Sequence, residues 1–446
     1  MKNAIEGLLG LPDTVLTSIA LMLPQRDRLD FAYSCTLLHA CSREWFPELT
    51  VHLPSKDAKR LAGWLAKSQA KAHVTMNSYL QISDVQAGLA ALRRGGACVV
   101  SLGPSRFRGP QGFPLAALEG LTALTRLDLR QAGRKQGRWE DLARAPALAE
   151  LFVESAEETA GSMAVLARLQ HLTLLHLGYF ATDWDGPQLL SHDFLPPVLT
   201  AMTALTALEL KGAGPDEEAF GWDMLAALPA LRRITYSNNE YFERLPAVVS
   251  RLTELQYVDL SFNNLRTASR LRPLRHLLDL DLCKNEMTEV PALTSAALTR
   301  LILGGNSVKR GFGRLAALLQ LQELQITIVG HGGKASSGWE VLGALRRLRH
   351  LGALADSLTE LPRGLSQLTA LTSLVVKLNW ESRRGVRKHS VMSGWECLWP
   401  LSRLQTLELY CMVSRQPPPA LPQQLERMQR AGLAVTVTTN PWPTWY

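Results

Sequence analysis

A short leucine pattern, L-x-x-L-x-L, recurs along this chain of 446 residues and constrains its fold more than any other feature. One copy is too short to bury its own apolar side, so neighbouring copies must stack and share a continuous core. The chain is therefore predicted to form a repeat array rather than several separate globular domains. The twelve copies lie at 121–129, 147–153, 169–177, 202–210, 228–236, 252–260, 274–282, 297–303, 321–326, 348–354, 368–376 and 401–409.

Each copy resembles a leucine-rich repeat, whose full pattern is L-x-x-L-x-L-x-x-N. Side chains alternate along a strand, so both leucines of L-x-L face the same side. The closing asparagine turns the chain by hydrogen-bonding backbone groups in the bend. The fold class expected is α/β, a leucine-rich-repeat solenoid shaped as a horseshoe with a parallel, concave sheet. The asparagine is present in five copies, at Asn239, Asn263, Asn285, Asn306 and Asn379.

A second pattern fixes where each coil begins. Trp, Pro or Phe stands twelve residues before the first apolar residue of L-x-L in eight copies, which we interpret as a packing position rather than an aromatic ligand site. All variation in repeat length then falls between a strand and the next such position, so the inserts emerge along one rim. The positions are Trp139, Pro196, Trp222, Pro246, Phe312, Trp339, Pro362 and Trp395.

The rim inserts are candidates for partner recognition, because loops on one face of a rigid array commonly bind partners. The two largest inserts span 178–196 and 377–395. The second is basic and is typical either of a solvated loop or of a clamp for an acidic segment. The candidate rim residues are Trp184, His192, Phe194, Trp380, Arg383, Arg384, Arg387 and Lys388.

Residues 11–49 depart from the repeat and predict three short apolar helices, the first ending at Pro24. Their pattern consists of L-P-D followed by paired apolar residues, an isoleucine, a second L-P and a later cysteine. This pattern is similar to an F-box. In that family these helices bind an adaptor, so the resemblance implies a set of adaptor-binding residues here. They are Leu11, Pro12, Val15, Leu16, Ile19, Leu23, Pro24, Leu29 and Cys35.

An F-box followed by leucine-rich repeats resembles the substrate-recognition subunit of an SCF-type E3 ubiquitin ligase. The resemblance implies a Skp-type adaptor and a cullin as partners of the N-terminal helices, and a protein substrate on the repeats. A second interpretation remains open, because a solenoid needs a cap over its first coil. The N-terminal helices would then be that cap, and the chain a non-ligase scaffold, for example on a cytoskeletal or axonemal assembly.

The chain is expected to have four parts. An F-box-like helical segment covers 1–49, and degenerate first coils cover 50–113, with strands near Val51–Leu53, Val74–Met76 and Val99–Leu102. The leucine-rich repeats cover 114–413, and a C-terminal cap and tail cover 414–446, including a last helix and strand within 421–439.

Composition narrows the class of protein. The six cysteines are too few for a disulfide framework, and no apolar run is long enough for a transmembrane helix. We therefore expect a soluble, cytoplasmic protein, with a nuclear or cytoskeletal location as alternatives. No hydrolase, metalloprotease or phosphate-binding motif is present, and we expect no enzyme activity, cofactor or metal. The net charge of +8 is spread along the chain and does not by itself require nucleic acid.

The central residue of each L-x-L is predicted to face the concave surface. Five of these residues are acidic and none is Lys or Arg, which disfavours binding of a phosphate backbone and favours a protein partner with basic or polar groups. The candidate partner-binding residues are Asp128, Phe152, His176, Glu209, Thr235, Asp259, Asp281, Ile302, Gln325 and Glu408.

Overall fold

The computed structural model divides the chain into two compact units. The first comprises Met1–Phe180 and Ala201–Leu205, and the second Ala181–Thr200 and Thr206–Tyr446. The structure describes residues 12–24, 27, 48–53, 62–63, 65–66, 70–76, 82–93, 98–104, 113–130, 138–154, 162–178, 196–211, 222–239, 242–328, 340–355, 361–378, 394–411 and 423–438.

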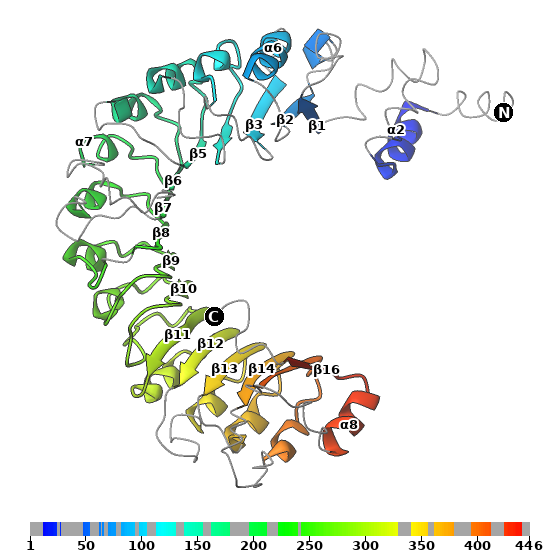
Figure 1. The fold of residues 1–446 in the computed structure, drawn as a ribbon, viewed down its shortest axis with the longest axis vertical. Coiled ribbons are helices and arrows are strands. Elements are labelled where there is room, and N and C mark those ends of the chain that lie inside the picture. Colours follow the sequence, from blue (N-terminus) through cyan, green and yellow to red (C-terminus); the bar gives the residue numbers. More distant parts are fainter. Residues whose placement is uncertain are drawn as a thin grey trace, which may run out of the picture. The chain divides into compact units, whose positions relative to one another are not determined.

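The first unit contains a parallel sheet whose strands follow one another in sequence order (Figure 1). Its strands are β1 (Glu48–Leu53), β2 (Lys71–Met76), β3 (Val99–Pro104), β4 (Arg126–Leu129), β5 (Glu150–Glu154) and β6 (Leu174–Gly178). Its helices are α2 (Asp13–Met22) and α6 (Ile82–Leu92), with 3₁₀ helices η3 (Leu115–Leu118), η4 (Trp139–Arg144) and η5 (Ser162–Arg168). The strands predicted before the first regular repeat are confirmed.

The second unit repeats the same alternation, again with parallel neighbours in sequence order. Its strands are β7 (Ala207–Lys211), β8 (Arg233–Ser237), β9 (Tyr257–Asp259), β10 (Asp279–Asp281), β11 (Arg300–Val308), β12 (Glu323–Ile328), β13 (His350–Ala355), β14 (Ser373–Leu378), β15 (Thr406–Cys411) and β16 (Ala434–Thr438). Its helical segments are α7 (Pro196–Leu199), η6 (Trp222–Ala227), η7 (Ala247–Arg251), η8 (Ser269–Leu271), η9 (Phe312–Ala317), η10 (Glu340–Ala344), η11 (Arg363–Gln367), η12 (Trp395–Leu398) and α8 (Gln423–Arg430). Helix α8 and strand β16 confirm the predicted C-terminal helix and strand.

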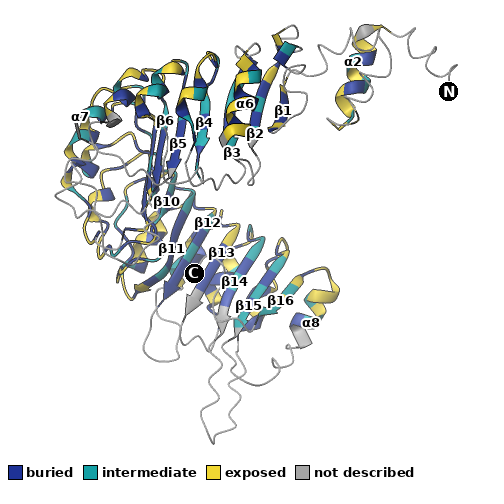
Figure 2. Cartoon of the chain, turned by 45° about the horizontal axis from the view of Figure 1, so that its top comes forward, coloured by how far each residue is buried: buried dark blue, intermediate teal, exposed yellow. Residues whose placement is uncertain are grey.

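The core lies between the strands and the 3₁₀ helices of each unit (Figure 2). In strand β10, Leu280 and the following Leu282 are fully buried, whereas Asp279 and Asp281 face the other side. This alternation is the one that the L-x-L pattern predicts. The side of each sheet that bears the central residues of L-x-L is called the open face below.

The Trp and Pro positions mark the start of the 3₁₀ helices. Trp139, Trp222 and Trp395 are the first residues of their helices and are buried. Pro246 and Pro362 directly precede η7 and η11, where a missing N–H costs no helical hydrogen bond. The burial of the three tryptophans supports the packing interpretation over an aromatic ligand site, while Trp339 lies outside the described residues.

Within the described part of the chain, no helix is both long and apolar enough to span a bilayer.

Buried asparagines connect successive coils of the second unit. Asn285 donates from Nδ2 to the carbonyl of Leu260 in the preceding coil (2.9 Å) and to that of Leu282 in its own (3.0 Å). Its Oδ1 accepts the backbone N–H of Leu265 in the preceding coil (3.0 Å). The predicted turn-forming role is thereby confirmed, and it extends across coils. The described members of this ladder are Asn239, Asn263, Asn285 and Asn306, and Asn379 lies outside the described residues.

The residue before each ladder asparagine has a left-handed backbone. Gly305 (φ 70°) and Asn238 (φ 64°) tolerate this conformation, whereas Lys284 (φ 54°) and Phe262 (φ 55°) carry a side chain that disfavours it. The Phe262 side chain is also 53% exposed. An exposed aromatic residue is therefore held in a backbone conformation that it does not favour.

Candidate functional site

The central residues of L-x-L form one column across each open face, because the L-x-L parts of neighbouring strands pair in the same register. In the second unit, Asp259 pairs with Asp281, and Asp281 pairs with Ile302. In the first, Asp128 pairs with Phe152, and Phe152 with His176. The column predicted from the sequence is confirmed as a geometric arrangement, with Glu209, Thr235, Gln325 and Glu408 in the register of the second unit.

Several members of the column are not accessible. Phe152, His176, Thr235 and Ile302 are buried, whereas the acidic members and Gln325 are partly exposed. The sequence pattern gives the direction of a side chain, but it does not show which long side chains of neighbouring strands lie over it. The four buried residues therefore belong to the packing of the face rather than to its contact surface.

Arginines cover the column in the first unit. The Arg126 guanidinium carbon lies 4.2 Å from the ring centre of Phe152, and that of Arg130 lies 4.7 Å from it. Arg130 Nη2 also donates to Asp128 Oδ2 at 2.6 Å, and Arg126 pairs with Glu150. Cation–π and charge-assisted contacts of this kind stabilise one another at a partly desolvated surface. The carboxylate of Asp128 is therefore already neutralised within the chain.

The central column contains no Lys or Arg, as the sequence states, but arginines flank it on the open face. In the second unit, Arg300 flanks the column and reaches three carboxylates at once. Its guanidinium nitrogens lie 2.9 Å from Asp279 Oδ1, 3.3 Å from Asp281 Oδ2 and 3.4 Å from Glu323 Oε2. Because one cation serves three anions here, this part of the open face is left with an excess of negative charge.

Asp259 and Asp281 have the least favourable electrostatic surroundings on this face. They are direct neighbours on adjacent strands, where like charges are destabilising. The pKa of Asp281 is raised to about 6. Burial is the main cause and the Asp259 carboxylate adds to it, while the N–H of Cys283 and the Arg300 guanidinium partly lower the pKa. Burial also raises the pKa of the Cys283 thiol to about 12, so this cysteine is not a poised nucleophile.

Replacing Asp281 with asparagine is expected to raise the free energy of unfolding at about pH 8 by about 1–2 kcal/mol. The native pKa lies above the unfolded one, so the native state binds more protons between about pH 4 and 6, and the wild type loses stability as the pH rises through this range. The advantage of the variant should therefore vanish below about pH 4. Urea unfolding at several pH values measures it, and equal stability of both proteins at every pH would contradict the prediction.

The N-terminal candidates divide into buried and exposed groups on helix α2, which ends before Pro24 as predicted. Leu16 and Ala20 are fully buried, so the Leu16 side chain is not accessible to a partner. Val15 is 41% exposed, Ile19 and Leu23 are partly exposed, and Pro12 and Pro24 are exposed. Leu11, Leu29 and Cys35 lie outside the described residues.

Sequence reasoning missed two exposed apolar residues of α2. Met22 is 86% exposed and follows Val15 by seven positions, with Ile19 between them, so the three share one side of the helix. Leu21 is 48% exposed on another side. Exposure of Met22 could not be read from the sequence, because the residues that bury Leu16 and Ala20 are not specified by helical periodicity. The large exposed apolar residues of the described chain are Val15, Leu21, Met22, Phe262, Leu319 and Trp399.

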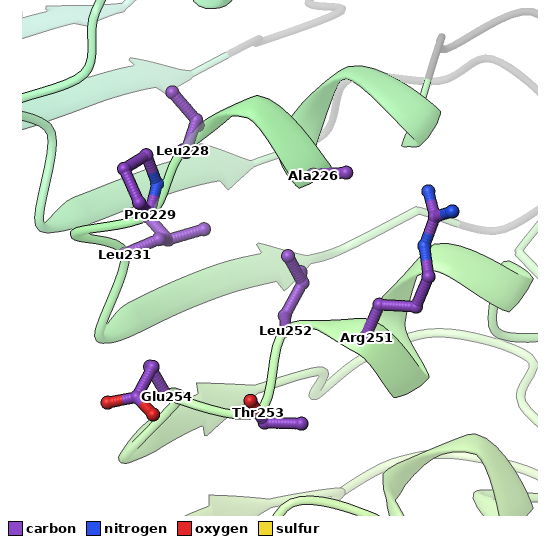
Figure 3. Close-up of a pocket in the computed structure, with 8 residues that line it drawn as sticks. All are labelled: Ala226, Leu228, Pro229, Leu231, Arg251, Leu252, Thr253 and Glu254. Atoms are coloured by element: carbon purple, nitrogen blue, oxygen red, sulfur yellow. The ribbon is translucent and has the colours of Figure 1, made fainter.

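A hollow between two coils offers no chemistry (Figure 3). It lies where η6 and η7 lead into the next strands, and its two charged groups have partners: Glu254 pairs with Arg232 at 3.4 Å and Arg251 with Asp223 at 3.9 Å. Nor do the described residues contain a group of three or more His, Cys, Asp or Glu side chains able to hold a metal ion. The residues that line the hollow are Ala226, Leu228, Pro229, Leu231, Arg251, Leu252, Thr253 and Glu254.

The candidate rim residues lie outside the described part of the chain. They are Trp184, His192, Phe194, Trp380, Arg383, Arg384, Arg387 and Lys388. The candidate site therefore consists of two surfaces in the described residues: the apolar side of α2 and the open face around β9 to β12.

Comparison with known proteins shows the fold. No protein-family model matches the chain. Human Podocan-like protein 1 is 31% identical over 166 residues, which cover 36% of this chain and 31% of that protein, so the chain spans less than a third of this relative. The structure of a leucine-rich-repeat protein from Leptospira interrogans has a TM-score of 0.51, with 15% identity, over 87% of this chain and 99% of that one. An internalin (inlF) from Listeria monocytogenes has a TM-score of 0.49 and 18% identity, over 74% and 89% of the two chains.

Proposed function

We propose that this leucine-rich-repeat protein is a non-catalytic, protein-binding subunit of an SCF-type ubiquitin ligase. Its N-terminal helices bind a Skp-type adaptor and, through it, a cullin, and the open face around β9 to β12 holds a protein substrate. Such a subunit acts by proximity, because a tethered substrate meets the ubiquitin carrier at a raised effective concentration.

The observation that carries the proposal is the apolar side of α2. Val15, Ile19 and Met22 lie at positions i, i+4 and i+7, and Met22 is 86% exposed. The buried residues of the same helix, Leu16 and Ala20, lie on a different side of it. A second, exposed apolar strip on a helix of ten residues is typical of a surface that a partner covers.

Two features support a protein substrate on the open face. Around β9 to β12 the face carries carboxylates paired with Arg300, which suits a polar peptide surface better than a phosphate backbone. It is also a continuous, rigid surface formed by successive parallel strands, as repeat proteins offer to extended partners.

Replacing Val15 and Met22 together with aspartate is expected to abolish capture of a Skp-type adaptor and its cullin by the full chain. Two charges in the exposed strip would oppose burial of that strip, while Leu16 and Ala20 keep the helix packed. The measurement is a pull-down with purified adaptor–cullin complex, with the fold of each variant checked by circular dichroism.

Leu21→Asp is the matched control, because Leu21 is on the same helix and is 48% exposed, but on another side. It should capture the adaptor as the wild type does. A folded wild-type chain that binds no adaptor would contradict the ligase proposal and favour the second candidate, a scaffold whose N-terminal helices cap the solenoid.

A further inference from the structure

We propose that Asp259 and Asp281 form a docking site for an arginine side chain of the bound substrate protein. The inference rests on the proposed function, because it assigns a chemical class of partner to the same open face. Four observations on the described residues support it.

The first is an occupied version of the site within the same chain. Asp128 is the central residue of its L-x-L, and its Oδ1 accepts the backbone N–H of Arg130, two residues later, at 3.1 Å. This bond fixes the carboxylate on the open face. The guanidinium of Arg130 then binds both oxygens, with Nε 3.0 Å from Oδ1 and Nη2 2.6 Å from Oδ2, while it stacks on Phe152. The chain thus shows how this kind of carboxylate holds a guanidinium.

The second observation is that the same carboxylate geometry recurs without its own arginine. Asp259 Oδ1 accepts the N–H of Ser261 at 3.0 Å, and Asp281 Oδ1 accepts that of Cys283 at 2.9 Å. Both are central residues of L-x-L, as Asp128 is. The residue two positions later is small in both coils, so neither coil supplies a guanidinium from this position. The carboxylates are oriented as Asp128 is. Among the described residues no arginine binds Asp259, whereas Arg300 Nη2 lies 3.3 Å from Asp281 Oδ2.

The third observation is the local balance of charge. Asp259 and Asp281 are paired residues of adjacent parallel strands, which places their backbones about 4.8 Å apart. Arg300 reaches Asp281 and Asp279, whereas Asp259 makes no ion pair within the described part of the chain. A bidentate cation between the two aspartates would relieve their mutual repulsion. A lysine would do so less well, because it is a point charge that cannot bind two carboxylates in a planar fork.

The fourth observation is an exposed aromatic residue three positions after Asp259 in the sequence. Phe262 follows Ser261 directly at the end of β9, and its ring is 53% exposed. Other coils have Asn, Lys or Gly at this left-handed position, which suits Asn and Gly better. Exposed aromatic residues are enriched among the side chains that dominate protein interfaces. The substrate segment is therefore expected to carry an apolar side chain next to its arginine.

The test uses the full chain and a hexa-arginine peptide as the probe, with binding followed by fluorescence anisotropy. The protein has a net charge of +8, so general electrostatics oppose binding of this peptide. Asp259→Asn/Asp281→Asn is expected to weaken binding about tenfold or more. Because the pKa of Asp281 is raised to about 6, the wild type should bind more tightly at about pH 7.5 than at about pH 5.5.

A second variant tests the site by filling it. Ser261→Arg places an arginine two residues after Asp259, as Arg130 follows Asp128. It should abolish peptide binding while both aspartates remain. Glu243→Gln/Glu286→Gln is the control for net charge, since these exposed carboxylates pair with Arg266, and it should bind as the wild type does.

The outcomes separate this inference from the proposed function. Three results would each overturn the arginine site without affecting adaptor capture. The first is that the wild type binds no hexa-arginine, the second that the Glu243/Glu286 control loses as much affinity as the Asp259/Asp281 variant, and the third that hexa-lysine binds as tightly as hexa-arginine. Binding that appears only after Arg383, Arg384 and Arg387 are replaced by serine would overturn the assignment to a partner, because the chain's own insert would then be the occupant. Loss of adaptor capture with intact arginine binding would refute the ligase role alone.

Discussion

Asn285→Ala is expected to lower the free energy of unfolding by about 3–4 kcal/mol. The asparagine is buried, and its side chain is bonded to the carbonyls of Leu260 and Leu282 and to the N–H of Leu265. Alanine would leave the buried N–H of Leu265 without its acceptor, and it would remove one of the two asparagine donors from each of the carbonyls of Leu260 and Leu282. Urea unfolding followed by far-ultraviolet circular dichroism measures the loss.

Asn238→Gly provides the control for this prediction. Asn238 is exposed and has a φ of 64°, and another coil already has Gly305 at the equivalent position. The change should therefore alter stability by less than about 1 kcal/mol. If both substitutions cost the same, the bonds of Asn285 between coils would not be the source of its contribution to stability.

Trp222→Ala is expected to lower the free energy of unfolding by about 3–5 kcal/mol. The indole is buried at the start of η6, in a cluster with Tyr236 and Phe242. Ring centres lie 4.9 Å apart between Trp222 and Tyr236, 5.4 Å between Trp222 and Phe242, and 4.6 Å between Tyr236 and Phe242. Removing the indole opens a large cavity and also removes two aromatic contacts. Thermal and urea unfolding measure the effect.

Trp222→Phe is the matched variant, because Phe312 occupies the equivalent position at the start of η9. It should cost less than half as much as the alanine variant, since a phenyl ring keeps most of the apolar contact. A loss as large as that of alanine would show that the indole N–H, and not ring packing, makes the main contribution at this position.

The repeat architecture was predictable because it depends on short-range periodicities. The L-x-L leucines, the Trp and Pro positions and the ladder asparagines each recur at a fixed spacing, and a stacked coil has few other ways to bury them. The same logic placed Asp259 and Asp281 in one column before their register was known.

The properties of the open face were less predictable, because they depend on contacts between coils. Asp259 and Asp281 occupy equivalent positions of their coils, yet Arg300 of the next coil pairs with Asp281, and no described residue forms an ion pair with Asp259. The decisive residue belongs to a neighbouring coil and lies outside the central column. Likewise, the side of α2 that is exposed depends on what packs against Leu16, which helical periodicity does not specify.

The asparagine ladder has a consequence for how such a chain can change in length. Each asparagine brings one set of bonds to its own coil and another to the coil before it, as Asn306 does with Leu303, Leu282 and Met287. Each coil thus supplies the asparagine that bonds to the coil before it, and also the backbone groups that bond to the asparagine of the coil after it. Duplicating or deleting a whole coil within this stretch would leave every junction chemically the same. Genetic gain or loss of single coils is therefore compatible with the fold. It would change the length of the binding surface without altering the hydrogen bonds between neighbouring coils.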